Sequence, residues 1–280
     1  MSTTIQTSDS WPGFAGLRRL IIFGDSYSAV GYSPTAHPPP SEDNPIGVEF
    51  PGMTWAEDGE PNWVGHLVTN YPLAPLLVYD FARGGDTVIG VRSQVERGFM
   101  LHLAKKPEWC AWNANDTLFV TWVGINDCAY ATEETVPLYI GTLFELQEDL
   151  FEDGARNFLF IDVPPVHRSP SGQRVPVRVA GERRSARLEL WNKLLREKAA
   201  EFASKHAEAT VLLFSSWATF SGVMDNPTAH GLTEKDTVSA ASRMWVDFLH
   251  PTSKMHDIVA RDVAEFLTNV PAYQAPQRTP

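Results

Sequence analysis

Residues 20–27 read Leu-Ile-Ile-Phe-Gly-Asp-Ser-Tyr, an apolar run that passes directly into a small polar turn. A short apolar run bounded by a turn is typical of a strand buried within a parallel sheet. Ligands bind to such sheets at the carboxyl ends of the strands. Ser26 stands at such an end, two residues after Gly24, and is therefore a candidate nucleophile, although an isolated Gly-Asp-Ser turn can equally be only a turn.

Similar apolar runs alternate along the chain with segments whose apolar residues are three and four positions apart. The expected strands are Leu20–Phe23, Leu76–Phe81, Leu118–Val123, Phe158–Val163 and Val211–Phe214. The expected helices are Trp63–Asn70, Val91–Leu103, Val136–Phe151, Glu182–His206 and Thr252–Leu267, with a short one around Trp217–Met224. This alternation predicts an α/β fold with a parallel sheet covered by helices on both faces.

The pattern contains no internal repeat and no interdomain linker, so we expect residues 1–280 to form a single domain. Residues 1–17 and 271–280 are expected to be peripheral tails. Residues 33–61 are rich in Pro, Gly and acidic residues and are too long for an ordinary connection. They predict a lid or binding loop on the substrate side.

The composition disfavours several classes of protein. With 43% hydrophobic and 20% charged residues, the chain can bury a core and should not be disordered. A formal net charge of −11 argues against nucleic acid or an anionic membrane surface as partner. No apolar run reaches the ~18–20 residues that span a bilayer. No signal peptide is visible, which favours a cytoplasmic protein; the mature form of a secreted protein is the alternative.

Several common catalytic signatures are missing from the sequence. It contains no G-x-S-x-G nucleophile elbow, no H-E-x-x-H, no P-loop and no G-x-G-x-x-G. The histidines and cysteines show no zinc-ligand spacing, so no metal site is expected. Cys110 and Cys128 can form one bridge or stay reduced.

Two further expected strands end in groups that could stabilise an oxyanion. The second leads to Gly84 and Gly85, where a backbone N–H can approach a ligand closely, unless the pair only makes the loop flexible. The third ends just before Asn126, whose side-chain amide could donate at the same rim or simply cap a helix.

A candidate base lies near the end of the chain. Asp247 precedes His250 by three residues, and a carboxylate at that spacing can orient the imidazole and stabilise its cation. Pro251 suits the first turn of a closing helix, which places His250 at the entrance to that helix. Together with Ser26, these residues supply a nucleophile, a base and an orienting group.

The four blocks resemble the GDSL, or SGNH, hydrolase family, which carries Ser, Gly, Asn and His in that order. The matching residues are Ser26 in F-G-D-S-Y, Gly85 in R-G-G-D-T, Asn126 in G-I-N-D and His250 in D-F-L-H-P-T. The segments P-N-W-V, T-L-F-V-T-W-V-G-I-N-D and L-H-P-T-x-x-x-H-D-I-V-A are similar to the fungal acetylesterases of carbohydrate esterase family 16. Tyr27 stands where the family usually has leucine.

This resemblance implies a three-layer α/β/α sandwich with a five-stranded parallel sheet in the flavodoxin-like order 2-1-3-4-5. It implies ester hydrolysis through an acyl-serine, without a metal or organic cofactor. Ser26, Asp247 and His250 would be catalytic, and Ser26, Gly85 and Asn126 would form the oxyanion hole, with Gly84 as the alternative to Gly85.

The expected substrate is a small ester with a short acyl group, chiefly acetyl, and an acetylated sugar is one candidate. The absence of an apolar lid in residues 33–61 favours a short acyl chain. Four tryptophans in or beside the rim segments suit sugar rings or are ordinary core residues: Trp55, Trp63, Trp112 and Trp122. The alternatives are a lysophospholipase, a thioesterase or an acyltransferase on the same site, or a catalytically silent carbohydrate-binding protein. The oligomeric state is left open.

Overall fold

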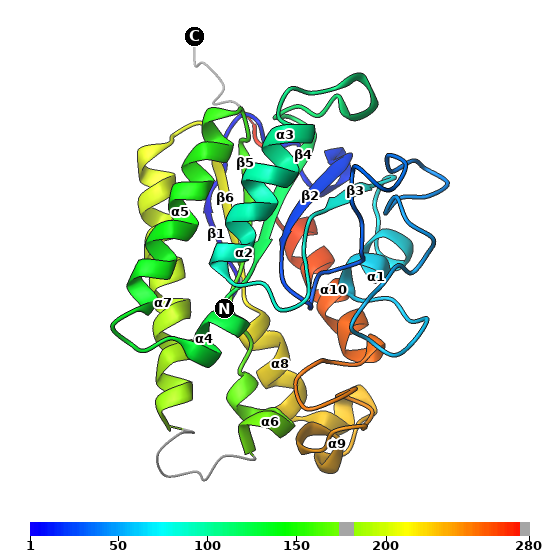
Figure 1. The fold of residues 1–280 in the computed structure, drawn as a ribbon, viewed down its shortest axis with the longest axis vertical. Helices are drawn as coiled ribbons and strands as arrows, with labels where there is room; N and C mark the ends of the chain where they lie inside the picture. The colour runs from blue at the N-terminus through cyan, green and yellow to red at the C-terminus, as the bar shows by residue number, and fades with distance from the viewer. Residues whose placement is uncertain (174–181, 275–280) are drawn as a thin grey trace.

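A central β-sheet with helices on both faces forms the body of the protein (Figure 1). The computed structural model describes residues 1–173 and 182–274. The strands are β1 (Thr3–Gln6), β2 (Arg19–Gly24), β3 (Leu77–Asp80), β4 (Thr117–Trp122), β5 (Asn157–Ile161) and β6 (Thr210–Phe214). All five predicted apolar runs are strands, and the predicted α/β class is confirmed.

The strand order across the sheet is β1-β6-β5-β4-β2-β3. Counted along the chain, the five parallel strands β2 to β6 have the order 2-1-3-4-5, as predicted. The central strands β2 and β4 pair in register from Arg19 opposite Thr117 to Gly24 opposite Trp122. Both strands are almost entirely buried, which explains why apolar residues dominate them, although Thr121 interrupts the run in β4.

The expectation that residues 1–17 form a peripheral tail is wrong. β1 adds to the sheet as a sixth strand, antiparallel to β6, with Thr3 opposite Leu213. Three apolar side chains of the same segment are buried in the core: Trp11, Phe14 and Leu17. The sequence of β1 is Thr-Thr-Ile-Gln, and none of its residues is fully buried. Ile5 is its only apolar residue and packs partly against the core, so β1 lacks the apolar run that marks the other strands and pairs with β6 through its backbone.

The other predicted tail lies partly outside the described residues, which end at residue 274. Residues 271–274 are exposed, and the backbone N–H of Tyr273 donates to the carbonyl of Trp11 at 3.0 Å. The two cysteines are both free and buried.

The long helices follow the predicted segments. They are α1 (Trp63–Asn70), α5 (Val136–Glu152), α7 (Glu182–Lys205), α8 (Ser216–Asp225) and α10 (Ser253–Thr268). Shorter helices are α4 (Ile125–Tyr130), α6 (Pro170–Gln173), α9 (Glu234–Val238), η1 (Phe14–Gly16), η3 (Glu108–Cys110), η4 (Val166–Arg168) and η6 (Pro227–His230). None of the helices in residues 1–173 and 182–274 combines the length and apolar character needed to cross a membrane.

The helix predicted over Val91–Leu103 is more irregular than its spacing suggests. It starts earlier, as α2 (Val88–Ser93), passes through the π-helical turn η2 (Gln94–Phe99) and ends in α3 (Met100–His102). A π-helical turn inside a helix often marks a functional site.

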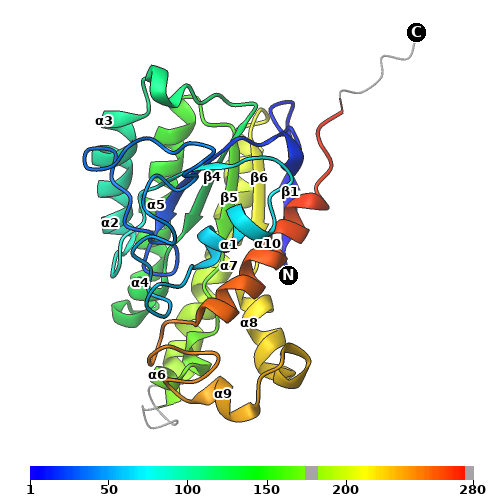
Figure 2. The same cartoon turned by 90° about the vertical axis from the view of Figure 1, so that its right-hand side faces the viewer.

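Two groups of helices cover the sheet. α2, α5 and α7 are neighbours on one face, and α1, α8 and α10 are neighbours on the other (Figures 1 and 2). Residues 33–61 form an irregular loop, in which the structure records only the isolated bridge between Ser41 and Asn44. The loop lies beside α1 (Figure 2), and Glu57 connects it to the start of α10.

Candidate active site

Ser26, His250 and Asp247 form one chain of hydrogen bonds. Ser26 lies in the turn after β2, and His250 lies just before α10, although 224 positions separate them in the sequence. The distance from Ser26 Oγ to His250 Nε2 is 3.0 Å, and that from His250 Nδ1 to Asp247 Oδ2 is 2.7 Å. The structure therefore brings together the three residues that the sequence assigns as nucleophile, base and orienting group.

The Asp247 carboxylate is held on both oxygens. Oδ1 accepts from the backbone N–H groups of Leu249 and His250, each at 2.7 Å. Burial alone would raise the pKa of Asp247, but the hydrogen bonds from the His250 ring and from these two amides outweigh it and lower that pKa below its usual value. Because a carboxylate can only accept, Nδ1 of His250 carries the ring proton and Nε2 faces Ser26 as a base.

Tyr27 joins the nucleophile turn to the histidine segment. Its side chain is fully buried, and its hydroxyl donates to the carbonyl of Leu249 at 2.7 Å. Burial raises the pKa of Tyr27 far above its usual value, so the phenol stays a neutral donor. The residue that departs from the usual leucine therefore fixes the segment next to His250, a role that no local sequence signal could reveal.

The three predicted oxyanion donors, Ser26, Gly85 and Asn126, lie in the segments after β2, β3 and β4. Gly85 is exposed, and its φ of 82° is in the left-handed region that favours glycine. The Asn126 amide donates to the carbonyl of Asp86 at 2.9 Å, which leaves its second N–H available. In residues 1–173 and 182–274, the structure records no acceptor for the backbone N–H groups of Ser26 and Gly85. These three donors are therefore available for a ligand.

The long loop reaches this site through Trp55. The Trp55 indole stacks on the His250 ring, with centroids 4.7 Å apart and an interplanar angle of 26°, and the residue is 46% exposed. A side chain on Gly84 would lie within 2.4 Å of the same indole, so the ring covers both His250 and the glycine loop. Glu57 anchors the loop by accepting from the backbone N–H of Ser253 at 2.7 Å.

The other three tryptophans near the rim belong to the core. Trp63, Trp112 and Trp122 are each at most 1% exposed. The indole N–H of Trp63 donates to Ser28 Oγ at 3.1 Å. Of the four, only Trp55 is substantially exposed.

Asn62 is a supporting residue that the sequence analysis missed. Its Oδ1 caps α1 by accepting from the backbone N–H of Val64 at 3.0 Å. Its Nδ2 donates to the carbonyls of Ser28 and Ala29, each at 2.9 Å. Asn62 therefore holds the turn that follows Ser26, and the motif P-N-W-V was the only signal that pointed to it.

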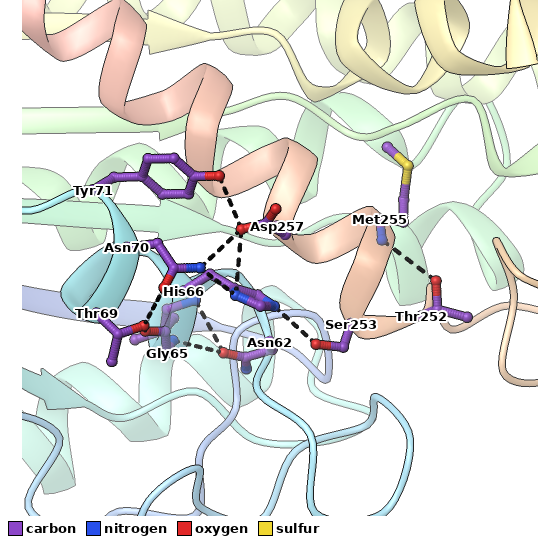
Figure 3. A network of polar contacts seen from close by, with 11 residues as sticks. Asn62, Gly65, His66, Thr69, Asn70, Tyr71, Thr252, Ser253, Met255 and Asp257 are labelled. Atoms are coloured by element: carbon purple, nitrogen blue, oxygen red, sulfur yellow. Dashed lines mark hydrogen bonds and ion pairs between the residues drawn. The ribbon is translucent and has the colours of Figure 1, made fainter. Parts of the chain in front are cut away.

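A second cluster joins the end of α1 to the start of α10 (Figure 3). Asp257 Oδ1 accepts from Tyr71 Oη at 2.9 Å and from Asn70 Nδ2 at 3.1 Å. The same Asn70 nitrogen donates to His66 Nδ1 at 3.1 Å, so the ring proton of His66 lies on Nε2 and is donated to Ser253 Oγ, 2.8 Å away.

A serine, a histidine and an aspartate are the residue types of a catalytic triad, but the hydrogen bond between this histidine and serine has the wrong direction for one. His66 donates to Ser253 and cannot take the serine proton in this arrangement. The desolvation of His66 lowers its pKa, against the opposing effect of Asp257, so the ring stays neutral at neutral pH. The cluster therefore supports α10 directly after His250.

Two buried acids lie behind the nucleophile. Burial raises the pKa of Asp25 to about 7, against a hydrogen bond from the Tyr27 backbone, and raises that of Asp127 to about 6. Each uses one oxygen to accept a backbone N–H, Asp25 from Tyr27 at 3.0 Å and Asp127 from Val88 at 3.1 Å. Both act as local structural acceptors.

His256 makes stability depend on pH. Its ring is buried without a hydrogen-bond partner in the described chain, and burial lowers its pKa from 6.5 to about 3. As the pH falls from 6.5 towards 3, His256 is therefore protonated in the unfolded chain but not in the folded chain. The free energy of unfolding falls in that pH range, because the proton binds to the unfolded state. The full loss is on the order of 5 kcal/mol.

We expect His256→Phe to remove this acid-side loss. Urea unfolding of both proteins at several pH values measures it: the advantage of the variant should grow steadily below pH 6.5, where the unfolded histidine gains its proton. Other titrating groups cancel in the difference between the two curves. Parallel curves across this range would contradict the prediction.

The described residues contain no group of three or more His, Cys, Asp or Glu side chains arranged to hold a metal ion. The chemistry that the site offers is nucleophilic acyl transfer. A serine hydroxyl meets an imidazole, a carboxylate fixes that imidazole, and free N–H groups lie in the neighbouring segments.

Comparisons with known proteins agree with this chemistry. Residues 20–263 match the GDSL-like Lipase/Acylhydrolase family. The chain is 31% identical over 271 residues to an acetylesterase from Thermothelomyces thermophilus, covering 88% of this chain and 87% of that protein. Two solved structures share the fold. An acetylxylan esterase from Geobacillus stearothermophilus has a TM-score of 0.55 at 16% identity, covering 89% of this chain and 94% of the other. A GDSL-like lipase from Parabacteroides merdae has a TM-score of 0.58 at 13% identity, covering 95% of this chain and 99% of the other.

With the family match extending over most of its length, the chain belongs to the GDSL-like lipase/acylhydrolase family and is a carboxylic ester hydrolase.

Proposed function

We propose that this ester hydrolase is a serine esterase that removes short acyl groups, chiefly acetyl, through an acyl-serine intermediate. The observation that carries the proposal is the hydrogen-bonded chain from Ser26 Oγ to His250 Nε2, at 3.0 Å, and from His250 Nδ1 to Asp247, at 2.7 Å. Such a chain activates a hydroxyl that is otherwise a weak nucleophile at neutral pH.

In the first half of the reaction, His250 Nε2 takes the Ser26 proton as Oγ attacks the ester carbonyl. Asp247 stabilises the imidazolium that forms. The negative oxygen of the tetrahedral intermediate accepts from the backbone N–H groups of Ser26 and Gly85 and from the Asn126 amide. His250 then gives its proton to the leaving alkoxide, which departs and leaves the acyl group on Ser26.

In the second half, water takes the place of the alcohol. His250 removes a proton from the water, the hydroxide attacks the acyl-serine, and the same donors stabilise the second oxyanion. The proton returns from His250 to Ser26 Oγ as the carboxylic acid leaves. The protein supplies all the groups that these steps require, and no cofactor takes part in them.

Two observations support a short acyl group on a soluble alcohol. The curated relative is named an acetylesterase and shares nearly a third of its residues with this chain. Trp55 stacks on His250 and is 46% exposed, and a flat indole beside the catalytic histidine suits the apolar face of a sugar ring. An acetylated carbohydrate is therefore the substrate class that we propose.

Release of p-nitrophenol from acetyl, butyryl and octanoyl esters tests this function. We expect the acetyl ester to be hydrolysed fastest, and acetylated sugars to be deacetylated in a second assay. Faster hydrolysis of the octanoyl ester would replace the proposal with lipid chemistry. No hydrolysis of any ester by the folded protein would favour a carbohydrate-binding protein.

Asn126 should contribute to the rate rather than to substrate binding. We expect Asn126→Ala to lower kcat by roughly 10²–10³, with little change in KM, because the oxyanion exists only in the transition state. Steady-state kinetics on p-nitrophenyl acetate measures both constants. Asn70→Ala, which removes an asparagine of the α1 cluster instead, is the matched control. An Asn126→Ala enzyme with nearly normal kcat would exclude Asn126 from the oxyanion hole.

A further inference from the structure

Gln94 connects the two sides of the site. It is the first residue of the π-helical turn η2, and it is only 2% exposed. Its Oε1 accepts from the backbone N–H of Gly24 at 2.9 Å, and its Nε2 donates to the carbonyl of Gly24 at 2.7 Å. The same Nε2 donates to the Asp86 carboxylate at 2.7 Å. Gly24 ends the strand that leads to Ser26, and Asp86 directly follows Gly85.

The chemistry of the contact requires a primary amide. The Gly24 peptide groups present one donor and one acceptor, and the Asp86 carboxylate adds a second acceptor. A glutamine side chain supplies the matching acceptor and two N–H donors. No other side chain of this length does so, and a buried amide left unpaired would be costly.

Asp86 is also held from the other side. Its backbone carbonyl accepts from Asn126 Nδ2 at 2.9 Å, while its carboxylate accepts from Gln94. The segment Gly85-Asp86 is therefore fixed between a residue of η2 and a residue of α4. Of these two contacts, only that of Gln94 also reaches the nucleophile strand β2.

We propose that Gln94 is a positioning residue for ester hydrolysis. By holding Gly24 and Asp86 together, it sets the distance between Ser26 and the N–H of Gly85. This inference rests on the proposed function of the site. Because the oxyanion donors act only in the transition state, loosening them lowers kcat more than it raises KM.

Gln94→Met tests the inference, since methionine has a similar length and none of the three hydrogen bonds. We expect kcat on p-nitrophenyl acetate to fall by roughly 10- to 100-fold, with KM within about three-fold of the wild type. The matched control is Gln147→Met on α5, where the glutamine is also fully buried and, among the described residues, its Nε2 donates only to the carbonyl of Leu143. We expect this control to keep nearly normal kcat.

The contact with Asp86 gives a second, independent test. Asp86→Ala should lower kcat as well, and the double variant with Gln94→Met should lose little more than the larger single loss, because both changes break one connection. Asp86→Asn keeps an oxygen that accepts from Nε2 and should recover most of the activity. If Gln94→Met does not fold, the two Asp86 variants carry the test.

The outcomes separate this inference from the function on which it rests. A wild-type protein without esterase activity would overturn the proposed function and the inference with it. An active wild type would overturn the inference alone if Gln94→Met kept normal kcat, if Gln147→Met lost as much, or if the losses of Gln94→Met and Asp86→Ala were additive.

Discussion

Ser26→Ala should lower the turnover of p-nitrophenyl acetate by at least ~10⁴-fold, while the protein stays folded. The hydroxyl that would form the acyl intermediate is removed, and His250 is left with nothing to deprotonate except water. Ser26 is 5% exposed, and within the described residues its Oγ bonds only to His250, so the substitution removes little packing. Steady-state rates for the two proteins, with matched circular dichroism spectra, measure the effect.

Ser253→Ala is the matched control for this prediction. Ser253 is also a buried serine hydrogen-bonded to a histidine, but His66 donates to it rather than accepting from it. We expect this variant to retain turnover within about three-fold of the wild type. A large loss of turnover in Ser253→Ala together with a small loss in Ser26→Ala would show that Ser253, and not Ser26, is the nucleophile.

Asp247→Asn should lower kcat by roughly 10³–10⁴. Both carboxylate oxygens of Asp247 accept, one from His250 Nδ1 and the other from the backbone N–H groups of Leu249 and His250. An amide has only one oxygen, so its NH₂ group must face one of these donors, and two N–H groups then oppose each other unless the imidazole changes its tautomer. If the oxygen faces the backbone, the amide donates to Nδ1, and the ring proton moves to Nε2, where it blocks removal of the serine proton.

The same substitution at Asp257 should have a small effect, and it serves as the control. The Tyr71 and Asn70 side chains both donate to a single oxygen of Asp257, and an amide oxygen can accept both. Rates at several pH values separate the two variants. An Asp247→Asn enzyme that keeps more than about a tenth of the wild-type kcat would show that Asp247 does not set the tautomer of His250.

The strands and site residues that could be predicted are those with a signal in a short contiguous segment of the sequence. Each of the five parallel strands lies in a short segment dominated by apolar residues, so these strands could be predicted, and the resemblance supplied their order. Ser26, Asn126 and His250 each stand in a short block at the end of such a strand or at the start of a helix. The pairing of Asp247 with His250 needs only a spacing of three residues.

The parts that were missed depend on contacts between distant segments. β1 is mostly polar and none of its residues is fully buried, so its pairing with β6 is seen only in the structure. The Tyr27 hydroxyl reaches a carbonyl 222 positions away, and Gln94 reaches Gly24 across 70 positions. Trp55 could be distinguished from the buried Trp63, Trp112 and Trp122 only in the structure, because its exposure depends on the path of the long loop. No local pattern encodes such pairings.

Trapping of the acyl intermediate tests the central claim most directly. The wild-type protein is mixed with p-nitrophenyl acetate, quenched in acid during turnover and digested, and the acetylated peptide is identified by mass spectrometry. We expect the acetyl group on Ser26, and none on that residue in a His250→Ala variant. Turnover with acetylation of a different residue, such as Ser253, would contradict the assignment of Ser26 as the nucleophile.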